Sequence, residues 1–305
     1  MTRVSSYGQQ QVMLNNLLRN QSNLFENQKQ VASGKVHDTY KDFAGEVGTL
    51  LGSKSILTRT QTFIGSTTHV QRNLDVNNLQ LENIKAKASD IRQTILETIA
   101  QDKTFVLMDV VSEAFSSIVA SLNTDIGGIH IFSGGRSDIE PVTSSKLSDL
   151  VAAATPADLF QNDQRKAIAK ISTNTNMEYG LLADNVGSGI FAAIKNIADF
   201  DNVTPISGDL SVAQRAFLES QLAVFDSAID DLQIIISNNG TRYSRVTDLL
   251  QEHNEQETFM RIFVSDIEDV NMAEAITRVN NDQIALDVSY KLTSELARTS
   301  LLNFI

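Results

Sequence analysis

The chain has 305 residues, a formal net charge of −12 at pH 7 and no cysteine. The negative charge argues against nucleic acid or an anionic membrane as a partner, because phosphates recruit clusters of Lys and Arg. The missing cysteines exclude disulfides, thiol catalysis and Cys-ligated metals. Three prolines, 6% aromatic residues and no tryptophan favour long helices over an aromatic-rich enzyme core. No apolar run approaches the roughly 20 residues that span a membrane.

The first predicted element is a thin amphipathic helix within residues 1–45, where glutamines interrupt a narrow apolar face. So narrow a face buries too little to stabilise an isolated helix, so we expect it to pack on another helix or on a neighbouring copy. Its apolar residues are spaced by three and seven: Leu14, Leu17, Leu24 and Val31.

Fuller apolar stripes follow in residues 74–99 and 107–122, and they predict two long helices of a helical body. The second helix should stop near Gly127 and Gly128. We assign residues 46–132 to the N-terminal half of this body. The stripes comprise Leu81, Ile84, Ala88, Ile91 and Ile95, then Leu107, Val111, Ala114, Ile118 and Leu122.

The centre of the chain, residues 133–208, changes to short apolar clusters and contains all three prolines. We interpret it as a small inserted domain of mixed strand and helix, with strands over residues 166–172 and 177–182 and a helix over 185–200. Such an insert contributes few contacts to its surroundings, so deletion of residues 145–201 is expected to leave the body folded.

The helical period returns in residues 209–265, which we assign to the C-terminal half of the body. Its stripe comprises Leu222, Phe225, Ile229, Leu232 and Ile236. The Asn238, Asn239, Gly240 run predicts a stop or kink, after which the rhythm continues to Val270.

Residues 266–305 form a second thin helix, again with a glutamine in its apolar series. Its stripe comprises Met272, Ile276, Val279, Leu286 and Tyr290. The chain then ends in apolar residues, Leu301, Leu302, Phe304 and Ile305. Chain ends are usually polar and frayed, so an apolar end predicts a partner that buries it.

Together these elements predict a mainly α fold: a long antiparallel helix bundle with coiled-coil terminal helices and a small inserted α+β domain. The thin seams near the two termini are the predicted assembly interface. Its residues are Leu14, Leu17, Leu24, Val31, Met272, Ile276, Val279, Leu286 and Tyr290.

One short motif suggests chemistry. Gly187, Gly189 and Ala192 satisfy G-x-G-x-x-A, as in a dinucleotide-binding turn. However, Pro205 and Gly208 break the region where the second strand of a βαβ unit should run. We therefore interpret the motif as a glycine-rich turn before a helix, and keep an enzyme built around it as the alternative from another class.

The four histidines are scattered and have no metal-ligand spacing. His253 lies on an otherwise apolar stripe and is interpreted as an interior histidine. The sequence thus predicts no catalytic residue, no cofactor and no metal.

Four segments resemble the flagellin superfamily of bacterial flagellar axial proteins. Residues 30–35 (QVASGK) look like the family's helix-ending segment, and residues 266–275 (DIEDVNMAEA) like the segment that leads into its terminal helix. Residues 299–305 (TSLLNFI) are similar to its chain end, and residues 239–242 (NGTR) also match.

Within the superfamily, the hook-filament junction family is the closer match. Residues 129–138 (IHIFSGGRSD), followed by Pro141, resemble its aromatic-x-Phe-Ser/Gly-Gly segment, which flagellins usually lack. Thr2 departs from the family's usual start, and residues 37–44 lack its acidic-Pro turn. Residues 42–45 (DFAG) lean towards flagellin instead, which keeps a filament subunit as the alternative.

The resemblance implies a structural subunit of the extracellular flagellum rather than an enzyme. It would join hook-associated protein 1 to flagellin, leave the cell through the flagellar type III export apparatus with an export chaperone, and order its terminal helices into a helical tube. Cysteine-free composition and thin terminal seams suit a chain that travels unfolded and buries its ends on assembly.

Overall fold

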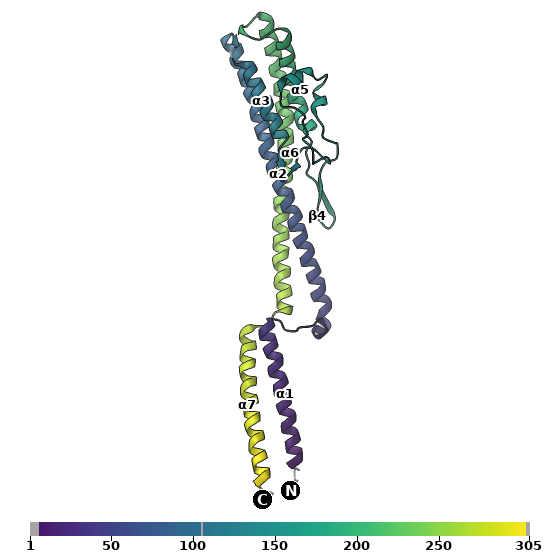
Figure 1. The fold of residues 1–305 in the computed structure, drawn as a ribbon, viewed down its shortest axis with the longest axis vertical. Coiled ribbons are helices and arrows are strands. Elements are labelled where there is room, and N and C mark those ends of the chain that lie inside the picture. Colours follow the sequence, from purple (N-terminus) through teal and green to yellow (C-terminus); the bar gives the residue numbers. More distant parts are fainter. Residues whose placement is uncertain (1–5, 105, 303–305) are drawn as a thin grey trace. The chain divides into compact units, whose positions relative to one another are not determined.

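The computed structural model describes residues 6–104 and 106–302, and it is mainly α-helical with small antiparallel strand pairs (Figure 1). The predicted fold class is thereby confirmed. The chain divides into two compact units: Met1–Thr60 with Glu255–Ile305, and Gln61–Asn254. Each unit thus combines segments that lie far apart in the sequence.

The first unit contains the two terminal helices and the connections that follow or precede them. Its elements are α1 (Ser6–Ser33), a 3₁₀ helix η1 (Tyr40–Glu46), the start of α2 (Val47–Gln101), the end of α6 (Val212–Glu268), and α7 (Met272–Leu302).

The second unit contains the remainder of α2 and α6 and everything between them. Its helices are α3 (Leu107–Leu122), α4 (Leu147–Ala152), the 3₁₀ helix η2 (Pro156–Leu159) and α5 (Ala183–Val203). Its antiparallel strand pairs are β1 (Lys103–Thr104) with β6 (Gly208–Asp209), β2 (Asp125–Ile126) with β3 (Ile129–His130), and β4 (Ile168–Ser172) with β5 (Thr175–Glu178).

The apolar stripes predicted for the body form the core of the second unit. In α2, Leu74, Leu81, Ala88 and Ile95 recur every seven residues and are fully buried. This spacing keeps one face of the helix against its partners along its whole length. Residues 107–122 form α3 with the predicted bounds, and its stripe belongs to the same core.

The central segment shares that core instead of packing by itself. One face of α5 is buried among α2, α3 and α6, and Phe191 lies with its ring centroid 5.0 Å from both Phe115 and Phe160. The predicted α+β insert, residues 133–208, therefore packs its helix α5 into the core of the second unit. The deletion of residues 145–201, which the sequence predicts the body to tolerate, would remove most of α5 from this core.

The glycines of the G-x-G-x-x-A motif lie inside α5, so the turn interpretation is also wrong. A Cβ at Gly187 would lie 3.0 Å from side-chain carbons of Leu122 and Phe160, and one at Gly189 would lie 3.6 Å from Cβ of Ala228. These glycines let α5 approach its neighbours closely, which explains their presence by packing and leaves no loop to cradle a phosphate.

A stop or kink is predicted at residues 238–240, and α6 runs through them without a stop. Asn239 is 1% exposed, and its Nδ2 donates to the backbone oxygen of Leu74 at 2.8 Å. The asparagine thus bonds to α2 instead of ending its own helix. Gly240 weakens a helix by only about 1 kcal/mol, which burial of the flanking stripe offsets.

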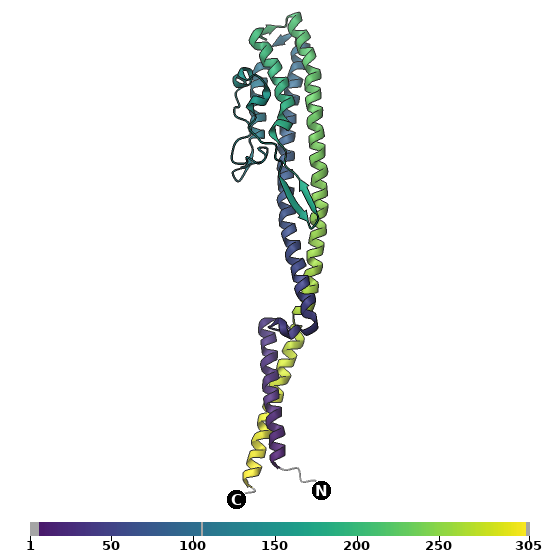
Figure 2. The ribbon, with the colours of Figure 1, turned by 90° about the vertical axis from the view of Figure 1, so that its right-hand side faces the viewer.

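The hairpin β4–β5 packs along α2 and α6 (Figure 2). Ile171 and Met177 pack with Val70, Leu74 and Val246. The predicted first strand is present, whereas the second is β5 at Thr175–Glu178, earlier than expected.

His253 lies beneath this hairpin and is 5% exposed, which confirms the prediction of an interior histidine. Its Nε2 lies 2.8 Å from the backbone oxygen of Ile171, and its ring stacks on Phe63. Because the carbonyl oxygen only accepts, Nε2 carries the proton in this contact.

The Ser-Gly-Gly run after β3 wraps around one carboxylate. The N–H groups of Gly135 and Arg165 donate to Oδ1 of Asp163 at 2.6 and 3.0 Å. Gly134 has a φ of +71°, and a Cβ there would clash with the same oxygen, so only glycine fits. These hydrogen bonds to its charged form, chiefly that from Gly135, lower the pKa of Asp163.

We predict that Asp163→Asn lowers the urea midpoint of unfolding at pH 7, and that the difference from the unaltered chain shrinks below about pH 4. A lowered folded-state pKa gives stability that is present above the ordinary carboxyl pKa and is lost as the pH falls through the folded value. Urea unfolding at several pH values measures this. Asp138→Asn, at an exposed position of the same loop, is the control; a pH-independent Asp163→Asn difference would contradict the assignment.

Candidate assembly interface

The terminal helices α1 and α7 lie side by side and antiparallel (Figures 1 and 2). Their facing positions follow alternating spacings of three and four residues, the geometry of a two-stranded coiled coil. On α1 the facing positions are Met13, Leu17, Asn20, Leu24, Asn27 and Val31, all half-buried. On α7 they are Ala275, which is buried, and the half-buried Val279, Asp282, Leu286, Ser289 and Thr293.

Polar side chains occupy the middle of this seam. Asn20 Nδ2 donates to Oγ of Ser289 at 2.9 Å, and Asn27 Nδ2 donates to Oδ2 of Asp282 at 2.5 Å. Apolar and polar layers therefore alternate along the contact between α1 and α7. Neither helix has a continuous apolar face like that of α2.

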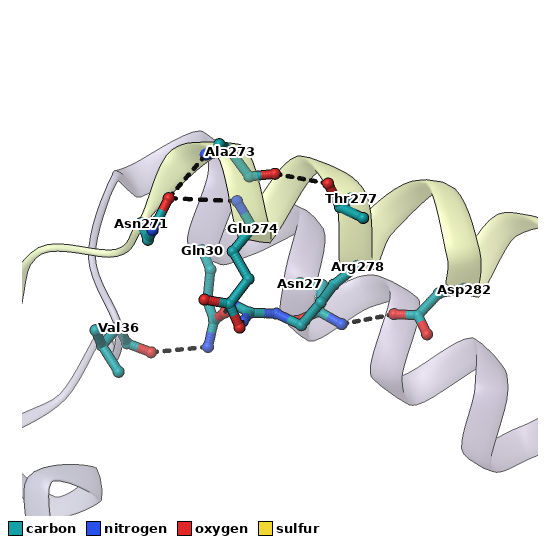
Figure 3. A network of polar contacts seen from close by, with 9 residues as sticks. All are labelled: Asn27, Gln30, Val36, Asn271, Ala273, Glu274, Thr277, Arg278 and Asp282. Atoms are coloured by element: carbon teal, nitrogen blue, oxygen red, sulfur yellow. Dashed lines mark hydrogen bonds and ion pairs between the residues drawn. The ribbon is translucent and has the colours of Figure 1, made fainter.

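A chain of polar contacts extends the seam towards the start of α7 (Figure 3). Arg278 forms an ion pair with Glu274 at 2.7 Å and donates to Oε1 of Gln30 at 3.1 Å. Gln30 in turn donates to the backbone oxygen of Val36 at 3.0 Å. The oxygen of Asn271 accepts from the first free N–H groups of α7, as an N-cap does.

The structure divides the nine residues predicted for the interface into two groups. Half-buried in the seam are Leu17, Leu24, Val31, Val279 and Leu286. Exposed by 43–49% are Leu14, Met272, Ile276 and Tyr290. The apolar chain end, residues 301–305, lies outside the side chains that the structure describes.

More large apolar side chains lie outside the seam than in it. Ten of those described on α1 and α7 are 43–64% exposed: Val12, Leu14, Leu18, Phe25, Met272, Ile276, Ile284, Val288, Tyr290 and Leu292. Single exposed apolar residues are ordinary, but this density on two adjacent helices is typical of a surface that becomes buried in an assembly.

A two-sided joint connects these helices to the rest of the first unit. The N–H of Val36 donates to the backbone oxygen of Glu268 at 2.9 Å, and the N–H of Val270 donates to that of Gly34 at 3.0 Å. Gly34, with a φ of +72°, ends α1 as glycine commonly ends helices, which fits the predicted helix-ending segment.

Ion pairs flank the same joint. Lys35 Nζ lies 2.6 Å from Asp269, and Lys54 Nζ lies 2.7 Å from Glu268. The hydrogen bond from Lys35 lowers the pKa of Asp269, and the same bond raises the pKa of Lys35. Because these groups are partly exposed, their effect is chiefly positional and weakens with salt.

Within the described ranges, no cluster of three or more potential metal-ligating His or acidic side chains is present, and no helix is apolar over a length that could cross a membrane.

The C-terminal part of the chain is similar to a known protein family. Residues 222–305 match the bacterial flagellin C-terminal helical region. This match covers α6 from residue 222 onward, the C-terminal side of the joint, and α7, and it confirms the resemblance to the flagellin superfamily that the residues indicated.

Three solved structures share the fold of this chain. A protein described as a flagellar hook-associated protein of Vibrio parahaemolyticus matches with a TM-score of 0.58 and 15% identity, over 75% of this chain and 100% of its own. FlgL of Xanthomonas campestris matches with a TM-score of 0.55 and 11% identity, over 70% and 99%. FlgL of Bacillus cereus matches with a TM-score of 0.50 and 12% identity, over 65% and 98%.

At these identities the likeness establishes a shared fold. No curated protein sequence is significantly similar to the chain.

We predict that in the dilute full-length chain the terminal pair exchanges its amide hydrogens at least roughly hundredfold faster than the core, because local stability follows buried apolar contacts. The comparison is between Leu17 and Leu286, which are half-buried, and Ile91, which is fully buried. Hydrogen exchange resolved by residue measures it, with Ile118 as a second core reference. Equal protection of the seam and the core would contradict the idea.

Proposed function

We propose that this chain is a structural subunit of the extracellular bacterial flagellum that joins hook-associated protein 1 to the flagellin filament, assembled through its paired terminal helices. Support for the junction role comes from the shared fold with FlgL and from the residues of the Ser-Gly-Gly loop. Support for assembly through the termini comes from the exposed apolar side chains of α1 and α7.

The exposed apolar residues carry the argument because folding of the single chain leaves them uncovered. Covering ten half-exposed side chains at about 1 kcal/mol each yields a free energy of order 10 kcal/mol. The entropic cost of association is of similar size. Dilute chains should therefore stay apart until a template presents several neighbours at once, which suits a subunit that adds only to a finished end.

The remaining partners follow from the same proposal. The chain would contact flagellin, hook-associated protein 1 and further copies of itself in a helical tube. It would reach that place through the flagellar type III export apparatus with the help of an export chaperone. We propose no catalytic role, no cofactor, and no nucleic-acid or membrane partner.

A flagellin-type filament subunit is the second candidate. The observation that favours it is the match of residues 222–305 to the bacterial flagellin C-terminal helical region.

Growth from seeds separates the two candidates. We predict that after a salt jump this chain does not extend flagellin filament fragments into long filaments, whereas flagellin extends the same seeds. A junction subunit binds a different neighbour on each side, so addition should stop after a limited layer. Electron microscopy of filament lengths measures the outcome. Long filaments grown from this chain alone would establish the filament subunit instead.

A single charge in the seam tests the role of the terminal pair. We predict that Leu286→Asp prevents incorporation into flagella, because a carboxylate would be buried against α1 at a cost of several kcal/mol. Cells should secrete the variant together with unpolymerised flagellin and fail to swim, while urea unfolding of the second unit stays unchanged.

The control for Leu286→Asp is Asn280→Asp, which places the same charge on an exposed position of α7. It should swim normally. Normal motility of Leu286→Asp, or its degradation before export, would refute the assembly role of this face.

A further inference from the structure

The two polar pairs of the seam are in phase with one another. Asn20 and Asn27 are seven residues apart on α1, and their partners Asp282 and Ser289 are seven residues apart on α7. In an antiparallel coiled coil this places the two pairs in layers separated by one heptad. Both hydrogen bonds are therefore made in one register of the two helices.

The apolar layers alone do not select that register. The native pairing brings Leu24 opposite Leu286 and Val31 opposite Val279. A slip of one heptad in one direction again gives two such layers, because it brings Leu17 opposite Leu286. It also brings Leu24 opposite Val279. Hydrophobic burial therefore scarcely separates the native register from this slip, whereas the opposite slip retains one such layer, Val31 with Leu286.

The polar layers distinguish the registers, because each slip keeps one polar pair and breaks the other: Asn20 faces Asp282 in the first slip, and Asn27 faces Ser289 in the opposite one. The first slip places Asn27 opposite Ala275, which is buried in the native seam, so the amide loses its carboxylate partner. The opposite slip places Asp282 opposite Gly34, which ends α1 and has no side chain. Each slip thus leaves at least one amide or carboxylate without a partner in a half-buried layer, where an unmade hydrogen bond is costly.

We propose that Asn20, Asn27, Asp282 and Ser289 set the register in which α1 pairs with α7 of the same chain, and so act as positioning residues for assembly. A single buried asparagine is known to fix coiled-coil register at some cost in stability. In this seam the cost in stability arises because polar side chains occupy layers that apolar side chains could otherwise fill. The register also fixes how the exposed apolar side chains of the two helices line up. That this alignment serves assembly rests on the proposed function, whereas the inference about the register does not.

The backbone joint at Gly34 and Glu268 is the competing explanation, because it also holds the end of α1 beside the start of α7. The two explanations differ in what happens when the polar pairs are replaced. If the joint sets the register, the pairing survives the replacement; if the polar pairs set it, slipped pairings appear.

Disulfide mapping in the full-length chain decides between them, since the chain has no cysteine of its own. Leu24→Cys with Leu286→Cys reports the native register, because these positions occupy one layer between the two polar pairs. Leu24→Cys with Val279→Cys, and Leu24→Cys with Thr293→Cys, report the two slips of one heptad. Each reporter is oxidised mildly in dilute solution, and the monomeric cross-linked product is quantified.

In the otherwise unaltered chain we expect the native reporter to cross-link at least about tenfold more than either slipped reporter. In a variant with Asn20→Leu, Asn27→Leu, Asp282→Leu and Ser289→Leu, we expect at least one slipped reporter to rise to a yield within about threefold of the native one. Unchanged dominance of the native reporter in this variant would overturn the proposal in favour of the joint.

Two matched controls keep the result interpretable. Four leucines at the exposed positions Asn16, Asn23, Asn280 and Asp287 add the same apolar content without touching the seam, and should keep the native register. The exchanged pair Asn27→Asp with Asp282→Asn restores one donor and one acceptor, and should keep it as well. Slipped cross-links in the exchanged pair would count against the proposal.

The outcome is independent of the flagellar role. The cross-links are measured on single chains in solution, whereas the proposed function is tested by filament growth and motility. If the polar pairs set the register but the chain joins no flagellum, the register inference stands and the proposed function is refuted. If the chain joins flagella but its register does not depend on the polar pairs, the proposed function stands and the register inference is refuted.

Discussion

The polar seam between α1 and α7 determines which side chains of the two terminal helices are buried and which stay exposed. Amide, hydroxyl and carboxylate groups occupy layers that apolar side chains would fill in a self-sufficient coiled coil. Among the described side chains of α1 and α7, ten large apolar ones are left outside the seam. The second unit shows the opposite arrangement, because α2, α3, α5 and α6 bury their apolar stripes in one shared core. The second unit buries its apolar stripes within one chain, whereas the terminal helices of the first unit leave large apolar side chains exposed.

Sequence periodicity predicts those elements best whose stability comes from burial along a whole face. The bounds of α3 follow from its stripe and the glycines after it, and the nested order of the long helices follows from stripes near both ends of the chain. The same reasoning fails for Asn239, since a polar residue that looks like a helix stop is used as a contact between α2 and α6. For residues 133–208, prolines and short apolar clusters indicate the α+β insert but do not reveal how much of α5 is buried.

The seam itself was predictable only in part. Leucine and valine spacing locates Leu17, Leu24, Val31, Val279 and Leu286, but it also selects Leu14, Met272, Ile276 and Tyr290, which face outward. A periodicity search that counts only apolar residues cannot see Asn20 or Asn27, because the layers between the apolar ones are polar. The signal that could have found them is the matched interval of seven residues between the polar residues of the two helices. Recognising this interval requires knowing which helices pair, and only the tertiary structure shows that α1 pairs with α7.

The antiparallel pairing of sequence-distant segments also bears on the route by which the chain folds. The hydrogen bonds that join the two halves connect residues 134 apart at Arg92 and Asp226, 165 apart at Leu74 and Asn239, 214 apart at Lys54 and Glu268, and 269 apart at Asn20 and Ser289. Closing a loop costs entropy that grows only with the logarithm of its length. Once the innermost pair has formed, each outer pair closes only the short stretch beyond it. The helices can therefore pair from the middle of the sequence outward, after a slow first step in which the innermost pair closes a loop of more than one hundred residues. The terminal helices would be the last to meet.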